Sequence, residues 1–209
     1  MRTLRPDTIV SLMPVQQPRQ PTVLQTTGTF QIFVGTAPVQ SLDAWAALSD
    51  GTVAVVRAAS YRVEWFPPAG EHSFTDAVPY VPIPITKEDK KRVVDAFKAI
   101  GDKALENLPQ RTSILSVTYE EPNAWPATHP PFRGDVDAMV DPQDRIWLTT
   151  RCLKDEQATC YDVIGRNGMR ADRYKLPPKT RVVGFGPGVV YTAFAQKSDK
   201  DVLQRHPIN

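Results

Sequence analysis

The sequence lacks most of the patterns that identify a chemistry. Its two cysteines, Cys152 and Cys160, are too few for a disulfide framework, and no C-x-x-C motif or Cys–His cluster suggests structural zinc. It has no G-x-S-x-G pattern, so a nucleophile elbow is not indicated. No apolar run approaches the ~20 residues of a membrane span, so no span is expected. The N-terminal stretch, interrupted by Asp7 and several prolines and glutamines, is not a signal peptide as it stands.

An excess of charge of one sign is also missing. Lysines and arginines number 25 against 23 aspartates and glutamates, a net charge of +2. Proteins that bind nucleic acid usually carry a basic stripe or a much higher isoelectric point, so we expect no nucleic-acid partner. What the sequence does have is proline, at 20 of its 209 positions. Frequent prolines favour many short elements joined by turns and argue against a helical bundle.

Short apolar runs bounded by turn residues predict strands along most of the chain. The clearest signal is Asp50-Gly51, because Asp-Gly between two apolar runs is typical of a hairpin. The predicted strand segments are 30–39, 43–49, 52–59, 61–66, 72–78, 113–119, 136–141, 145–152, 159–165, 169–177, 180–186, 189–195 and 201–207.

These runs form three groups that can be aligned with one another. Gly51, Asp144 and Gly188 stand at the equivalent turn, and residues 63–70 overlay residues 161–168. The last two turns are 44 residues apart, which is typical of propeller blades. The first two are 93 residues apart, so about one extra blade length is inserted between the first group and the second.

The insert, at about residues 79–133, contains the one predicted helix. Residues 86–108 carry an apolar stripe at 3.6-residue spacing, with Thr86 as N-cap, Asp89 at the third helical position and Pro109 as the stop. The stripe consists of Val93, Phe97, Ile100 and Ala104. A Pro-rich loop follows the strand predicted after the helix. Before the first strand, residues 1–25 are predicted to be an irregular leader, which leaves 26–209 as one β domain with this insert.

Segments 43–70, 137–177 and 182–207 resemble blades of bacterial six-bladed β-propellers of the NHL-like and lactonase-like group. The resemblance implies a mainly β fold: a partial propeller of about three four-stranded blades with a helical insert. In that group the last blade supplies three strands and an N-terminal segment supplies the fourth, a place that Phe30–Val39 would take. The resemblance also implies an extracytoplasmic protein if Met1 is a truncated start, whereas a native Met1 predicts a cytoplasmic one.

About three blades are present where the family has six. An open stack leaves unpaired edges and an exposed apolar flank, which soluble proteins avoid. Three explanations follow: the chain is a fragment, two copies form one ring, or the insert caps a smaller assembly. We favour association or a fragment over a stable single half-ring, and the expected partner is a second copy or another chain that completes the ring.

Three acidic residues lie near the beginnings of innermost strands: Asp43, Asp135 and Asp137. The resemblance implies that such side chains hold a divalent cation near a central channel, and oxygen ligands suit Ca²⁺. The alternative is that these carboxylates end turns and accept backbone N–H bonds. We expect no cofactor, with Ca²⁺ as the ion that such a site would take.

Four further residues are candidates for ligand binding. Arg57 and Arg151 end the second strands of their blades and would bind an anionic ligand, or else pair with strand carboxylates such as Glu64. Trp125 and His129 lie in the Pro-rich loop, which would either cover the channel mouth or hold the insert in place.

Two structural predictions complete the set. Cys152 and Cys160 end and begin successive strands, so they would face each other across a hairpin and form a disulfide in an oxidising compartment. Trp45, Trp65 and Trp147 lie within strands and are predicted to be core between sheets. The sequence favours a non-catalytic binding or scaffold module that recognises a protein or small ligand through its loop face. The alternative is a metal-dependent lactonase- or esterase-like hydrolase.

Overall fold

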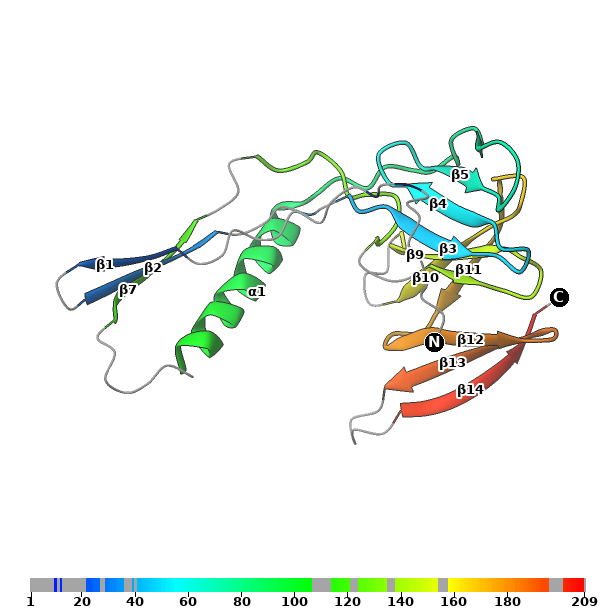
Figure 1. Cartoon of the computed structure of the whole chain (residues 1–209). Helices are drawn as coiled ribbons and strands as arrows, with labels where there is room; N and C mark the ends of the chain where they lie inside the picture. Colours follow the sequence, from blue (N-terminus) through cyan, green and yellow to red (C-terminus); the bar gives the residue numbers. More distant parts are fainter. Residues whose placement is uncertain are drawn as a thin grey trace, which may run out of the picture. The chain divides into compact units, whose positions relative to one another are not determined.

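The computed structural model is mainly β, as the sequence predicts, with one α-helix among the residues it describes (Figure 1). The described residues are 10, 12, 22–26, 29–35, 39, 41–106, 114–120, 124–134, 138–153, 158–195 and 201–208. They belong to two compact units. The first contains residues 41–81 and 130–209, and the second contains residues 14–40 and 82–129. Residues 1–13 are counted with the first unit.

The first unit contains three antiparallel sheets. The first sheet has the order β3-β4-β5-β6, the second β11-β10-β9-β8 and the third β12-β13-β14, so each is a meander of consecutive strands. Their bounds are β3 Ala44–Ala47, β4 Val53–Arg57, β5 Arg62–Phe66, β6 Ser73–Phe74, β8 Met139–Val140, β9 Ile146–Thr150, β10 Thr159–Ile164, β11 Arg170–Leu176, β12 Thr180–Gly186, β13 Val189–Ala195 and β14 Asp201–Pro207. Each strand lies where an apolar run predicts one.

The three aligned turn positions share one backbone conformation. Gly51, Asp144 and Gly188 all have positive φ, at 82°, 56° and 66°. Glycine adopts this left-handed conformation without strain, and aspartate tolerates it better than most residues. The tight β3–β4, β8–β9 and β12–β13 connections therefore follow from residues that the sequence alone singles out.

The first and second sheets pack face to face. Strand residues alternate between faces, and Ala54, Val56 and Val63 of the first sheet pack in one cluster with Ile146 and Leu148 of the second. We call the face that each sheet turns to the next one along the chain its forward face, and the opposite face its rear face. The forward face of the first sheet thus covers the rear face of the second.

The second and third sheets repeat this arrangement. Trp147 and Val163 lie on the forward face of the second sheet, since strand residues alternate between faces and Ile146, Leu148 and Ile164 lie on the rear face. They pack against Val182 and Val190 of the third sheet. In Figure 1 the three sheets follow one another from β3–β5 through β9–β11 to β12–β14. The stack therefore has two contacts, and each joins a forward face to a rear face.

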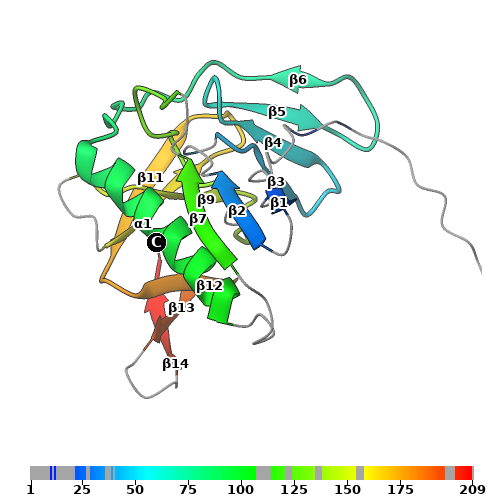
Figure 2. The ribbon, with the colours of Figure 1, turned by 90° about the vertical axis from the view of Figure 1, so that its left-hand side faces the viewer.

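The second unit contains a three-stranded sheet of order β1-β2-β7 and the helix α1. The strands are β1 Thr22–Thr26, β2 Thr29–Gly35 and β7 Ile114–Glu120, and the helix spans Lys87–Glu106. Strand β2 is antiparallel to β1 and parallel to β7. Figures 1 and 2 show α1 running alongside this sheet. Regular structure thus begins within the segment predicted to be an irregular leader.

The predicted role of 30–39 as the fourth strand of the last sheet is wrong. Strand β2 lies between β1 and β7, and the described strands of the third sheet are β12, β13 and β14. The physical reason is proximity along the chain: only two residues separate β1 from β2, so a hairpin forms with a small loss of chain entropy. Among the described residues, no helix has the length and apolarity needed to cross a membrane.

Candidate interaction site

Asp43, the one described member of the predicted calcium set, lies in an ion-pair network. Its Oδ2 is 2.8 Å from Nη1 of Arg57, and its Oδ1 accepts a 3.0 Å hydrogen bond from the backbone N–H of Ala58. This is the alternative that the sequence left open, a carboxylate that takes a backbone N–H. Asp135 and Asp137 lie outside the described residues, within which no cluster of three or more metal-ligating side chains occurs. Calcium binding stays a prediction.

Arg57 bridges two carboxylates on the first sheet. Besides Asp43, it contacts Glu64, with Nε and Nη2 at 2.8 and 2.7 Å from Oε2. Arg62 contacts the other oxygen of Glu64 at 3.0 Å. The hydrogen bond from Arg57 lowers the pKa of Glu64 against the opposing effect of burial, and the bond to Glu64 raises the pKa of Arg57. Pairing with strand carboxylates is therefore what the structure shows for Arg57.

The second sheet has its own buried carboxylate, Asp162, on the same face as Ile164. It is 2% exposed and lies 3.2 Å from Nε of Arg173 and 3.4 Å from Nη1 of Arg170. It also accepts a 2.8 Å hydrogen bond from the hydroxyl of Tyr61, which belongs to the β4–β5 connection of the first sheet. Burial, with the charge of Asp162, raises the pKa of Tyr61. This bond fastens the first sheet to the second.

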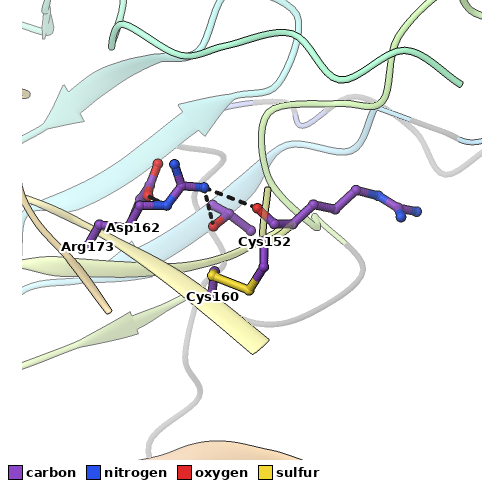
Figure 3. The surroundings of a disulfide bond; sticks show 6 residues. Cys152, Cys160, Asp162 and Arg173 are labelled. Carbon is purple, nitrogen blue, oxygen red and sulfur yellow. Dashed lines mark hydrogen bonds and ion pairs between the residues drawn. A yellow bond between two sulfur atoms is a disulfide. The ribbon is translucent and has the colours of Figure 1, made fainter. Parts of the chain in front are cut away.

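Cys152 and Cys160 form a disulfide next to this network, with their Cα atoms 5.3 Å apart (Figure 3). They close the loop between β9 and β10. Nη2 of Arg173 donates a 3.1 Å hydrogen bond to the carbonyl of Arg151, so the backbone of Arg151 helps to hold β11 in place. Figure 3 shows Arg173 reaching from β11 toward Asp162 beside the disulfide.

The turns of the first and second sheets are also joined. Asp144 accepts hydrogen bonds from the backbone N–H and the hydroxyl of Ser49, at 2.9 and 2.8 Å. Arg166 pairs with Asp50 and lies 3.6 Å from Asp144. The backbone N–H of Thr52, followed by Arg166, lowers the pKa of Asp50 to about 2. These bonds join the two neighbouring sheets at their turns.

A groove of about 560 Å³ lies where the three sheets meet at β3, β8 and β12. Its apolar lining includes Leu48, Met139, Val140 and Phe185. Its acidic members, Asp141 and Asp144, already accept hydrogen bonds from Arg145 and Ser49. The groove therefore offers mainly apolar surface.

His129 and Trp125 contact the start of α1 in the second unit. His129 is buried, with Nε2 at 3.1 Å from Oδ2 of Asp89. Its backbone N–H donates to the carbonyl of Ile83 at 2.8 Å. Lys90 lies over the ring of Trp125, with Nζ 5.7 Å from the ring centroid. Within their unit, these two residues hold the Pro-rich loop against the helix.

Asp89 also caps the helix, as its position predicts. It accepts a 3.0 Å bond from the N–H of Thr86, and its own N–H donates to the hydroxyl of Thr86 at 3.1 Å, which completes a capping box. Burial alone would raise the pKa of Asp89, but the Thr86 N–H and then His129 and the Thr86 hydroxyl together lower it to about 2.

We expect an Asp89→Ala variant to lose about 1 kcal/mol of stability at pH 7, the typical effect of removing a helix cap. A lowered pKa in the folded state means that this contribution is complete above the ordinary value of 3.8 and fades as the pH falls toward about 2. Melting curves at pH 7, 4, 3 and 2 should therefore show the gap between wild type and variant closing. Asp95→Ala, at an exposed position of the same helix, is the control, and an equal gap for both variants would contradict the cap.

The end faces of the stack carry exposed apolar side chains. On the rear face of the first sheet, Trp45 is 55% exposed and Phe74 is 64% exposed. On the forward face of the third sheet, Leu203 is 67% exposed, whereas Val183, at the register shift of β12, is 44% exposed and lines the groove. The core prediction is thus right for Trp65 and Trp147, at 8% and 1% exposed, and wrong for Trp45. The strand pattern alone gives no sign of whether another sheet covers a given face.

Comparison of the chain with protein-family models, curated proteins and solved structures gave no match in any of the three.

Proposed function

We propose that this chain is a non-catalytic interaction module of the β-propeller type, which binds a protein partner through the end faces of its sheet stack. The observation that carries the proposal is the exposure of Trp45, Phe74 and Leu203 on those faces. Exposed apolar surface is typical of protein-binding sites, and Trp45 and Phe74 lie at the two ends of one row across the first sheet. Tryptophan is also among the residues that contribute most to binding energy.

The propeller architecture is supported by matching features of the three sheets. The aligned turn positions share positive φ, and so do Gly70 and Gly168 in the next turn of the first two sheets. Aligned strand residues also lie on matching faces. Ala54 and Trp147 are on forward faces, and Val55 and Leu148 are on rear faces. Consecutive meanders that stack face to face are the building pattern of propellers.

A binding role also agrees with the use of the charged groups near the sheets. Asp43, Glu64 and Asp162 each pair with arginines of their own sheet. Their geometry supports a rigid scaffold that presents surfaces. We therefore expect the apolar end faces, rather than these paired carboxylates, to bind the partner.

Photo-crosslinking in cells tests the proposal. A photoreactive residue at position 45 should give a covalent adduct of one defined mass, which mass spectrometry then identifies. The control is position 169, where Met169 is 62% exposed on a turn of the second sheet and off the end faces. Equal labelling from both positions, or none from position 45, would refute a protein partner at this face.

A further inference from the structure

We infer that the partner is a second copy of this chain, with the forward face of the third sheet of each copy covering the rear face of the first sheet of the other. This inference rests on the proposed function and names its partner. The two copies would close one ring, in which the end-face contact forms twice.

The first argument is the direction of the internal contacts. Inside the chain, the forward face of the first sheet meets the rear face of the second, and the forward face of the second meets the rear face of the third. Two faces are left over within the described stack, one rear and one forward. A contact between these two faces would be of the same kind as the two contacts inside the chain, in which a forward face packs against a rear face.

The second argument is the likeness between two rear faces. Val53 and Val55 of the first sheet align with Ile146 and Leu148 of the second sheet. Ile146 and Leu148 pack against the forward face of the first sheet. Glu64 likewise aligns with Asp162.

The two aligned carboxylates have matching environments. Asp162 is buried, pairs with two arginines and lies at the contact with the preceding sheet. Glu64 is 6% exposed and also pairs with two arginines. The rear face of the first sheet is therefore built like a rear face that another sheet covers.

The third argument concerns the forward face of the third sheet. Tyr191 and Ala193 align with Ala54 and Val56, which form the forward contact of the first sheet. Leu203 lies beside Ala193 in the register of β13 and β14 and extends this surface. On the rear face of the first sheet, Trp45, Val55, Glu64 and Phe74 form one row across the strands. Val55 and Glu64 are buried in the middle of this row, and Trp45 and Phe74 are exposed at its two ends. The exposed apolar side chains available to the contact are therefore Trp45 and Phe74 on one face and Leu203 on the other.

Ring size favours two copies. A forward face that binds a rear face is a heterologous contact, which gives a ring when the rotation closes and a filament when it does not. Propellers typically have roughly four to eight blades. Two copies of a three-sheet stack fall within that range, whereas three copies exceed it.

The test combines mass measurement with complementary variants. Light scattering on the wild-type chain should give twice the monomer mass of 23.3 kDa. Trp45→Glu and Leu203→Glu should each raise the dissociation constant ~10-fold or more, because each puts a charge into both contacts of the dimer. Met169→Glu, at a similarly exposed turn position, should leave the dimer intact.

Mixing the two variants gives the sharpest result. A ring with one chain of each kind has both substitutions in one contact and none in the other, so the mixture should regain dimer mass relative to either variant alone. A monomeric wild type, filaments or no recovery on mixing would overturn the inference. If position 45 crosslinks a different protein, the proposed function stands and the second copy does not.

Discussion

Replacing Trp147 with alanine is expected to lower the free energy of unfolding by about 3–5 kcal/mol, the usual range for a large aromatic residue removed from a core. Trp147 is 1% exposed and lies between the second and third sheets. Its ring centroid is 4.8 Å from that of Tyr174 and 5.0 Å from that of Phe185. Its Nε1–H donates a 2.9 Å hydrogen bond to Oδ2 of Asp141. The variant therefore loses both packing and the partner of a buried carboxylate.

Urea unfolding measures the effect, and the chain offers a matched control. Trp45→Ala makes the same substitution on an exposed face, where we expect a loss below about 1 kcal/mol. Both variants should be compared at high dilution, because association would add a concentration-dependent contribution at position 45. If Trp147→Ala cost no more than the control, the contact between the second and third sheets would not contribute to stability as described.

The two tryptophans also show how far the sequence predicts the fold. Alternating apolar residues and turn signals locate the strands of the first unit, since both are properties of short segments. Burial on a particular face depends on which sheet packs there. Trp45 and Trp147 both lie in strands, yet only Trp147 has a sheet over it within the described stack.

Short segments also do not determine which strands pair with each other. The strand at Thr29–Gly35 is predictable, but its partners were predicted wrongly. Its pairing with Ile114–Glu120 joins segments far apart in the sequence, and nothing in either segment specifies the other. The helix at Lys87–Glu106 is the opposite case, because its cap signal is local, whereas the predicted stop at Pro109 lies outside the described residues.

The same distinction applies to the candidate site. For Arg57, the sequence predicts pairing with strand carboxylates as one of two alternatives, and the structure contains such a pair with Asp43, since carboxylates and arginines on neighbouring strands pair locally. The bond from Tyr61 to Asp162 spans 101 residues and has no local signal. In the sequence alignment of the first two groups of strands, Glu64 and Asp162 occupy the same position. This shared acidic residue is the sequence signal that indicates a carboxylate at this position of the sheet.

Asp162→Ala is expected to lower the free energy of unfolding by about 3–5 kcal/mol, the range for breaking a buried charge pair. Tyr61 is 1% exposed, and the substitution leaves its hydroxyl without an acceptor. It also removes the carboxylate that Arg170 and Arg173 contact. Chemical denaturation measures the loss. Asp172→Ala, which removes a half-exposed carboxylate 3.6 Å from Arg145 on the same sheet, is the control and should cost about 1 kcal/mol or less.

A double-mutant cycle then separates the bond between the sheets from the ion pairs within the second sheet. Tyr61→Phe removes only the hydroxyl and should cost about 1.5–3 kcal/mol, because its acceptor is a buried charged group. In the Asp162→Ala background the same change should cost much less, since its partner is already gone. Additive losses would show that the two residues act independently. The bond would then have no part in holding the first sheet to the second, and the contact between them would depend on apolar packing and on the bonds between their turns.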